Sequence, residues 1–123
     1  MKPQSKNVEA IYPLSPLQEG MLFHSIYAPD SGVYVTQACV TLRGDLDVAR
    51  FKRAWAEVTA RHSILRTLFV WEGLPKPHQV VRKQIDLPWT ELDWQGLAES
   101  EAENRLAEFL AADQAQGFRV DQA

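Results

Sequence analysis

The run "RHSILRTLF", residues 61 to 69, constrains the fold more than any other stretch, because it sets an arginine inside a hydrophobic segment. Arg66 stands between two leucines, in a segment whose pattern predicts a strand with apolar residues on both faces. A buried guanidinium needs a carboxylate partner, since an unpaired buried charge is strongly destabilising. No compelling acid lies close in the sequence, so we expect the partner outside these 123 residues. Arg61 and His62 instead read as cations that favour the end of the preceding helix.

Composition narrows the class of protein. The chain has 123 residues, enough for one domain or part of one, and its 46% hydrophobic and 24% charged residues are typical of a globular chain. Its net charge of −3 argues against nucleic-acid binding. The first residues lack the apolar core of a signal peptide, and no apolar run approaches the ~18 residues of a membrane span. With Cys39 as the single cysteine, we expect a cytoplasmic protein.

Local signals predict the first half of the chain. Residues 1–11 are polar and predict an extended arm. A helix follows, because Ser15 can cap it, Pro16 suits its first position and Gln18 completes a capping box. Residues 33–43 are rich in β-branched side chains and apolar on both alternating faces, which predicts a strand buried on both faces.

The second half predicts two helices around a hairpin. Asp47 caps a helix that reaches about residue 61, and residues 64–72 and 78–82 predict hairpin-paired strands. A last helix is expected over about residues 97–115, with Gly117 as its C-terminal cap and a buried stripe of Ala102, Leu106, Phe109 and Leu110. The expected order is α-β-α-β-β-α, so the fold class is α/β or α+β.

The sequence contains no self-sufficient active site. His24, His62 and His78 are far apart, which does not favour a metal site. Ser15 is explained as a helix cap, and Cys39 lies mid-strand without a positioned base. No glycine-rich phosphate loop is present. We therefore predict no catalytic residue, no metal and no directly bound cofactor.

Two motifs carry a resemblance. "RHSILRTLF" resembles the second core motif of nonribosomal peptide synthetase condensation domains, R-H-x-x-L-R-T-x-F, and "YPLSPLQEGMLFHS", residues 12–25, resembles the first. The helix between them and the ending "GFRVDQA" are also similar to that family, in the right order. The resemblance covers nearly the whole chain, and the two motifs at this spacing make it specific.

This resemblance implies a fold like chloramphenicol acetyltransferase, of which a condensation domain holds two halves around a tunnel. The implied activity is peptide-bond formation: an acceptor amine attacks a donor thioester. Both substrates are carried on the 4′-phosphopantetheine arms of upstream and downstream carrier domains, which are the implied partners. Residues 12–123 would be the N-terminal fragment of such a domain.

The resemblance also implies roles for the motif residues. The family's central motif, H-H-x-x-x-D-G, has an aspartate that pairs with an arginine. The second motif, with Arg61, His62, Arg66 and Thr67, would brace that histidine loop, and which of the two arginines reaches the aspartate stays open. The first-motif helix would lie near the tunnel or a docking partner, with Ser15, Gln18, Met21 and His24.

The chain contains no H-H-x-x-x-D-G, so we expect residues 1–123 to be inactive alone. The first motif is nearest to the subtype that accepts a D-configured donor from an epimerisation domain. An alternative function is docking, in which residues 1–11 and the first motif receive the C-terminal helix of an upstream epimerisation-domain subunit. A third interpretation is a relative of the same fold, such as an epimerisation domain or a free-standing acyltransferase.

Overall fold

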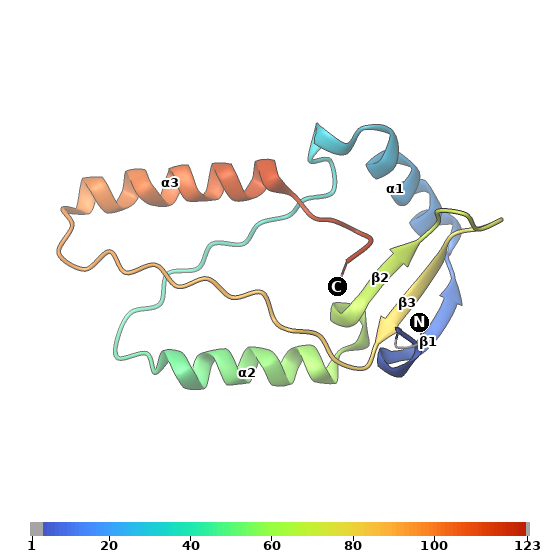
Figure 1. Ribbon diagram of the computed structural model, residues 1–123. Helices are drawn as coiled ribbons and strands as arrows, with labels where there is room; N and C mark the ends of the chain where they lie inside the picture. Colours follow the sequence, from blue (N-terminus) through green and yellow to red (C-terminus); the bar gives the residue numbers. More distant parts are fainter. Residues whose placement is uncertain (1–3, 123) are drawn as a thin grey trace.

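The computed structural model describes residues 4–122, and it combines helices with a small antiparallel sheet (Figure 1). The strands are β1 (Val8–Pro13), β2 (Thr67–Val70) and β3 (His78–Arg82). The helices are α1 (Pro16–Tyr27), α2 (Val48–Arg61) and α3 (Glu99–Gln116), and short 3-10 turns cover Gln4–Asn7, Pro29–Ser31 and Ser63–Arg66. The class is thus α+β, as predicted, but the order of helices and longer strands is β-α-α-β-β-α rather than the expected one.

The sheet has the order β1-β3-β2, so β3 lies in the middle and both pairings are antiparallel. The β2–β3 pair confirms the predicted hairpin, with Leu68 opposite Val80. The β1–β3 pair joins distant parts of the sequence and contains an irregularity between Val8 and Ala10. The extended arm predicted over residues 1–11 is therefore only partly right, because its end is a strand of the sheet; residues 1–3 lie outside the described residues.

Two helix starts follow the predicted local chemistry. At α1, the Gln18 backbone N–H donates to the Ser15 hydroxyl, and the Gln18 side-chain oxygen accepts from the Ser15 N–H at 2.9 Å. This is the complete capping box, with Pro16 at the first helical position. At α2, the Asp47 carboxylate accepts from the Arg50 N–H at 2.9 Å, which confirms the predicted cap.

The predicted strand over residues 33–43 is wrong. In the structure this segment is an irregular connection that runs from α1 towards α2, and most of its side chains are exposed (Figure 1). A β-strand exists only where a neighbouring strand accepts its backbone hydrogen bonds. Among residues 4–122 no strand pairs with this segment. Cys39, which lies within it, is a free exposed thiol.

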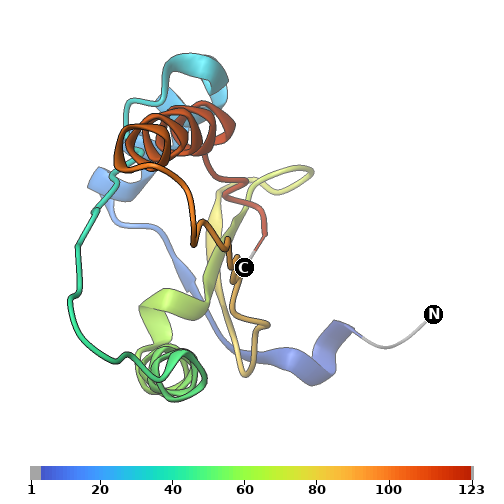
Figure 2. The same ribbon diagram turned by 90° about the vertical axis from the view of Figure 1, so that its left-hand side faces the viewer.

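Two further expectations differ from the structure: the length of the strand over residues 64–72 and the burial of the apolar stripe on the last helix. The expected strand over 64–72 is shorter, because Ser63–Arg66 forms a 3-10 turn and only Thr67–Val70 pairs with β3. The last helix and its Gly117 cap are confirmed to within two residues, but its apolar stripe is not buried. Leu106 and Phe109 are 38% and 40% exposed. Figure 2, which views α2 and α3 end-on, shows extended chain rather than a packed layer between the two helices.

The core is small, and its residues come from β2, β3 and α1 with the residue that precedes its cap. Its buried apolar residues are Leu14, Leu22, Leu68, Val80 and Val81. The accessible surface is 10587 Å², whereas a compact monomer of 14.0 kDa would expose about 6,700 Å². Much apolar surface of α2, α3 and the extended segments is therefore uncovered. Within residues 4–122, none of the helices is long and apolar enough to cross a membrane.

Candidate functional site

The two sequence motifs meet at one groove of about 550 Å³, which we call the motif groove. The first-motif helix α1 forms one wall, the turn Ser63–Arg66 and β2 of the second motif form another, and β3 forms the floor between them. Its lining residues are Tyr12, Gln18, Met21, Leu22, Ser25, Tyr34, Ser63, Ile64, Thr67, Phe69, Gln79, Val81 and Val120. The groove is mostly apolar, with hydroxyl and amide groups around it, which is the usual composition of a ligand pocket.

An amide pair fixes α1 against the sheet at this groove. Gln18 and Gln79 exchange two side-chain hydrogen bonds, with N···O distances of 3.4 and 3.2 Å. The Gln79 side chain also donates to the carbonyl of Pro13 at 3.2 Å. Because Gln18 takes part in the capping box as well, the start of α1 and the middle strand share one polar network. The helix cannot slide along β3 without breaking it.

Three polar side chains lie in or beside the groove: Tyr34, Ser25 and His24. The His24 Nδ1 and the Tyr34 hydroxyl are 2.9 Å apart, and their rings stack with centroids 6.2 Å apart. Tyr34 lines the groove, whereas His24 does not. The Ser25 hydroxyl, which also lines it, donates back to the carbonyl of Met21 at 2.9 Å. The His24–Tyr34 contact holds α1 to the chain that follows it.

The C-terminal segment reaches the same groove. The Phe69 N–H on the outer edge of β2 donates to the Val120 carbonyl at 2.8 Å. Arg119 and Asp121 flank this contact and form an ion pair of 2.8 Å. The hydrogen bond from Arg119 lowers the pKa of Asp121 below its ordinary value, and the pKa of Arg119 is raised for the same reason. This bond holds the C-terminal segment against the outer edge of β2.

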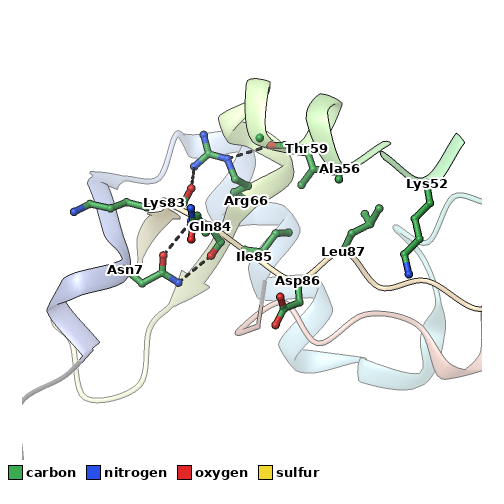
Figure 3. Close-up of a pocket in the computed structure, with 11 residues that line it drawn as sticks. Asn7, Lys52, Ala56, Thr59, Arg66, Lys83, Gln84, Ile85, Asp86 and Leu87 are labelled. Carbon is green, nitrogen blue, oxygen red and sulfur yellow. Dashed lines mark hydrogen bonds between the residues drawn. The ribbon is translucent and has the colours of Figure 1, made fainter. Parts of the chain in front are cut away.

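The second motif is anchored through Arg66, on the other side of the sheet. Its side chain is 7% exposed, and its Nη1 donates to the Glu9 carboxylate at 2.8 Å. Its Nε donates to the Thr59 carbonyl at 3.1 Å, and Nη1 also contacts the carbonyls of Arg82 and Lys83. Figure 3 shows Arg66 between Thr59 and Lys83, at the wall of a second groove of about 770 Å³.

Glu9 corrects the expectation that no partner of Arg66 lies within the chain. It stands in β1, 57 residues before Arg66. Sequence reasoning missed it because the two are brought together only by the β1–β3 pairing. One signal was available: Glu9 is the only acidic residue among the first 18. A neighbouring contact supports the same region, since the Asn7 side chain exchanges hydrogen bonds with the backbone of Gln84 (Figure 3).

The structure separates the other predicted site residues into groups. Gln18, Met21 and Thr67 line the motif groove together. Arg61 and His62 are exposed at the end of α2, and neither forms an ion pair with any residue from 4 to 122. Ser15 is exposed and serves as the helix cap. The part of the chain that the structure describes contains no cluster of three potential metal ligands.

Comparisons with known proteins agree with the motifs. The family described as "Condensation domain" matches residues 8–123. Two different subunits of linear gramicidin synthase from Brevibacillus parabrevis are 50% identical over 117 residues and 51% identical over 118 residues, which is 95% and 96% of this chain. One of the plipastatin synthase subunits from Bacillus subtilis (strain 168) is 41% identical over 116 residues, or 94% of this chain. The chain spans only 2% to 4% of the length of these relatives.

Proposed function

The chain belongs to the condensation-domain family of nonribosomal peptide synthetases, and we propose that it forms the first part of a domain that makes a peptide bond. In this reaction the amine of the acceptor attacks the carbonyl carbon of the donor thioester. The new C–N bond forms, the C–S bond breaks, and the proton of the amine is passed to the departing thiol. Both substrates arrive on the 4′-phosphopantetheine arms of upstream and downstream carrier domains, so the chain itself needs no bound cofactor.

The meeting of the two motifs at the motif groove is the observation that carries this proposal. Gln18 and Met21 of the first motif lie across from Thr67 and Phe69 of the second, around one apolar groove. A pair of motifs kept for separate structural reasons would not need to share one surface. We infer that this surface faces the substrate tunnel of the complete domain.

The two arginines of the second motif take different roles in this proposal. Arg66 already bonds Glu9 and three backbone carbonyls through its Nε and Nη1, and its side chain is only 7% exposed, so another acid has little access to it. Arg61 is exposed and has no ion pair among the described residues. We therefore assign to Arg61 the contact with the aspartate of the H-H-x-x-x-D-G motif, and to Arg66 the support of the turn that follows it.

The proposal includes completion of the sheet in a fold like chloramphenicol acetyltransferase. Residues 33–43 have the composition of a two-face buried strand but no strand partner in residues 4–122. The outer edge of β2 is bonded at Phe69, by the carbonyl of Val120. Apolar side chains of α2 and α3 are exposed. Further strands between β2 and residues 33–43 would cover all three surfaces.

The test of this function is a condensation assay with one donor-loaded and one acceptor-loaded carrier protein. The synthetase that carries this chain should form a dipeptidyl thioester on the acceptor carrier, detected by intact-protein mass spectrometry. Residues 1–123 alone should form none, because they lack the histidine motif. No dipeptidyl product from the larger protein would refute the proposed reaction, and product from residues 1–123 alone would refute the requirement for the missing motif.

A second candidate function, docking, is favoured by the position of β1. This strand is at the edge of the sheet, and its Ile11 and Tyr12 are 59% and 53% exposed. An exposed edge with apolar side chains is a surface on which another chain can bind. The partner in this proposal is the C-terminal helix of an upstream epimerisation-domain subunit. That subunit would supply a D-configured donor substrate. Titration with such a helix peptide checks it, and no binding at millimolar concentration would count against it.

A further inference from the structure

We propose that Glu9 is a positioning residue of the condensation reaction: its carboxylate holds Arg66, and Arg66 in turn fixes the second-motif turn that directly follows Arg61 and His62. This inference rests on the proposed function for its catalytic consequence. Its structural part, the control of the turn Ser63–Arg66 by Glu9, stands independently. Glu9 belongs to neither of the two sequence motifs.

The contacts around Arg66 give the first argument. The side chain is 7% exposed, so its charge has been largely removed from water. Its partners other than Glu9 are neutral carbonyls, those of Thr59, Arg82 and Lys83. Within residues 4–122, Glu9 is the one carboxylate within ion-pair distance of Arg66. A desolvated cation without a counter-charge is unfavourable, so the Glu9 carboxylate determines whether Arg66 stays in this place.

The position of Arg66 in the chain gives the second argument. It is the last residue of the turn Ser63–Arg66, and its Nε reaches back to the carbonyl of Thr59 in the last turn of α2. Within the turn, the Leu65 N–H donates to the His62 carbonyl at 3.0 Å. Arg66 therefore fixes the angle between the end of α2 and the start of β2. Arg61 and His62 lie inside this corner, so their direction depends on it.

The position of Glu9 gives the third argument. β1 leads into the first-motif helix and pairs with β3 along its length, and two side-chain contacts add to this pairing. Gln18 bonds Gln79 at the beginning of α1, and Glu9 bonds Arg66 near the start of β1. The first contact positions the first motif, and the second contact connects the same segment to the second motif. Glu9 thus adds a direct side-chain link between the segment of the first motif and the second motif.

The Glu9 side chain is 47% exposed, so it can be replaced without opening a cavity. This makes Glu9→Gln a mild substitution that keeps the shape and removes the charge. Glu9→Asp keeps the charge with a shorter reach. Glu103→Gln is the matched control, because Glu103 is exposed on α3 and forms no ion pair among the described residues.

The experiment compares these variants in the complete synthetase, assayed with loaded carriers at a temperature where each variant is fully folded by circular dichroism. Glu9→Gln should lower kcat about tenfold and leave the KM for the carriers unchanged, because a misplaced group slows the chemical step without weakening carrier binding. Glu9→Asp should recover most of the rate, and Glu103→Gln should behave as wild type. A kcat of Glu9→Gln within about twofold of wild type would overturn the catalytic consequence.

A double variant tests whether the two residues act through one contact. Arg66→Lys and Glu9→Gln together should be no slower than Arg66→Lys alone. Losses that multiply would show that Glu9 acts by another route and would overturn the proposal.

Hydrogen exchange separates this inference from the proposed function. The Leu65 amide and its neighbours in residues 63–67 should exchange about tenfold faster in Glu9→Gln than in wild type, while β3 keeps its protection. If wild type forms no dipeptide, the proposed reaction fails, and this measurement alone decides whether Glu9 positions the turn. Equal exchange in the two proteins would overturn the positioning role whatever the assay shows.

Discussion

Gln18 and Gln79, 61 residues apart, face each other across the motif groove and exchange hydrogen bonds through both amides. Gln18 acts in two places at once, since the same side-chain oxygen that accepts from Gln79 also completes the capping box with Ser15. The first motif therefore combines a local task, starting α1, with a tertiary one, docking α1 on β3. This double use gives a physical reason for a glutamine at this position of the motif.

The amide pair leads to the first prediction. Gln79→Ala should lower the free energy of unfolding by about 1 kcal/mol, because it removes one partly buried hydrogen-bonded pair. Gln18→Ala should cost about 2 kcal/mol, since the helix cap is lost as well. Urea denaturation of each variant measures both. The double variant should cost less than the sum of the two single variants, and a strictly additive result would contradict a direct Gln18–Gln79 interaction.

The second prediction concerns Arg61, to which we assign the contact with the aspartate of the histidine motif. Arg61→Gln should lower the rate of dipeptide formation in the complete synthetase about 100-fold, as expected for a misplaced catalytic loop. Its free energy of unfolding should change by less than about 0.5 kcal/mol, because the side chain is exposed. Arg53→Gln, an exposed position on the same helix, is the control and should keep full activity. An unchanged rate in Arg61→Gln would remove this assignment.

The third prediction uses two glycines in different environments. Gly20 lies within α1, and a methyl group added there would meet no atom within 4 Å. Gly20→Ala should stabilise the protein by about 0.5–1 kcal/mol, because alanine loses less backbone entropy in a helix. Gly117 ends α3 with φ 60° and ψ −154°, a region that is nearly exclusive to glycine. Gly117→Ala should destabilise by about 1–3 kcal/mol.

Thermal unfolding of the two variants side by side checks this pair. The added methyl group at Gly117 would meet Val35 at an ordinary 3.7 Å, so crowding is not the cause of the expected loss. Equal melting temperatures for the two variants would mean that the backbone conformation at Gly117 is not the one described.

The fourth prediction is the pH dependence of the C-terminal segment. The hydrogen bond from Arg119 lowers the pKa of Asp121, partial desolvation opposes this shift, and the charge of Arg119 adds to it. A group with a lowered folded-state pKa stabilises the structure above its unfolded pKa and loses that effect as the pH falls through the folded value. The Arg119–Asp121 contact should therefore persist at neutral pH and weaken only at acid pH, below the ordinary carboxyl value of about 4.

Carboxyl-carbon NMR titration measures this shift directly. The midpoint of Asp121 should lie below that of an ordinary aspartate in wild type, and it should rise in Arg119→Gln. The Phe69 amide, which bonds the neighbouring Val120 carbonyl, reports whether the segment leaves β2 at the same time. The same Asp121 midpoint in both proteins would contradict the ion pair.

Local chemistry explains which elements could be predicted from the sequence. The starts of α1 and α2 were predicted correctly because Ser15, Gln18 and Asp47 bond groups only three residues away. The end of α3 was found because Gly117 adopts a conformation that few other residues tolerate. The β2–β3 hairpin was found because its strands are close in sequence. Each of these features depends on interactions within a few residues or across one turn.

The expectations that failed depend on distant partners. Residues 33–43 carry the composition of a strand, yet a strand forms only when a neighbour is present, and none is present in residues 4–122. The stripe of α3 was expected to be buried, but burial needs a facing surface. The sequence predicts only an extended arm over residues 1–11, because nothing local reveals that β1 pairs with β3.

Arg66 illustrates the difference between what the sequence alone predicts and what depends on the tertiary structure. By itself the sequence determined that an arginine among leucines would be buried and would need an acid, because the cost of burying a lone charge is general. Only the tertiary structure decided that the acid is Glu9, since β1 and the second motif are neighbours in space and not in sequence. The same rule holds for the motif groove: the sequence supplied the two motifs, and the pairing of β3 with both β1 and β2 placed them on one surface.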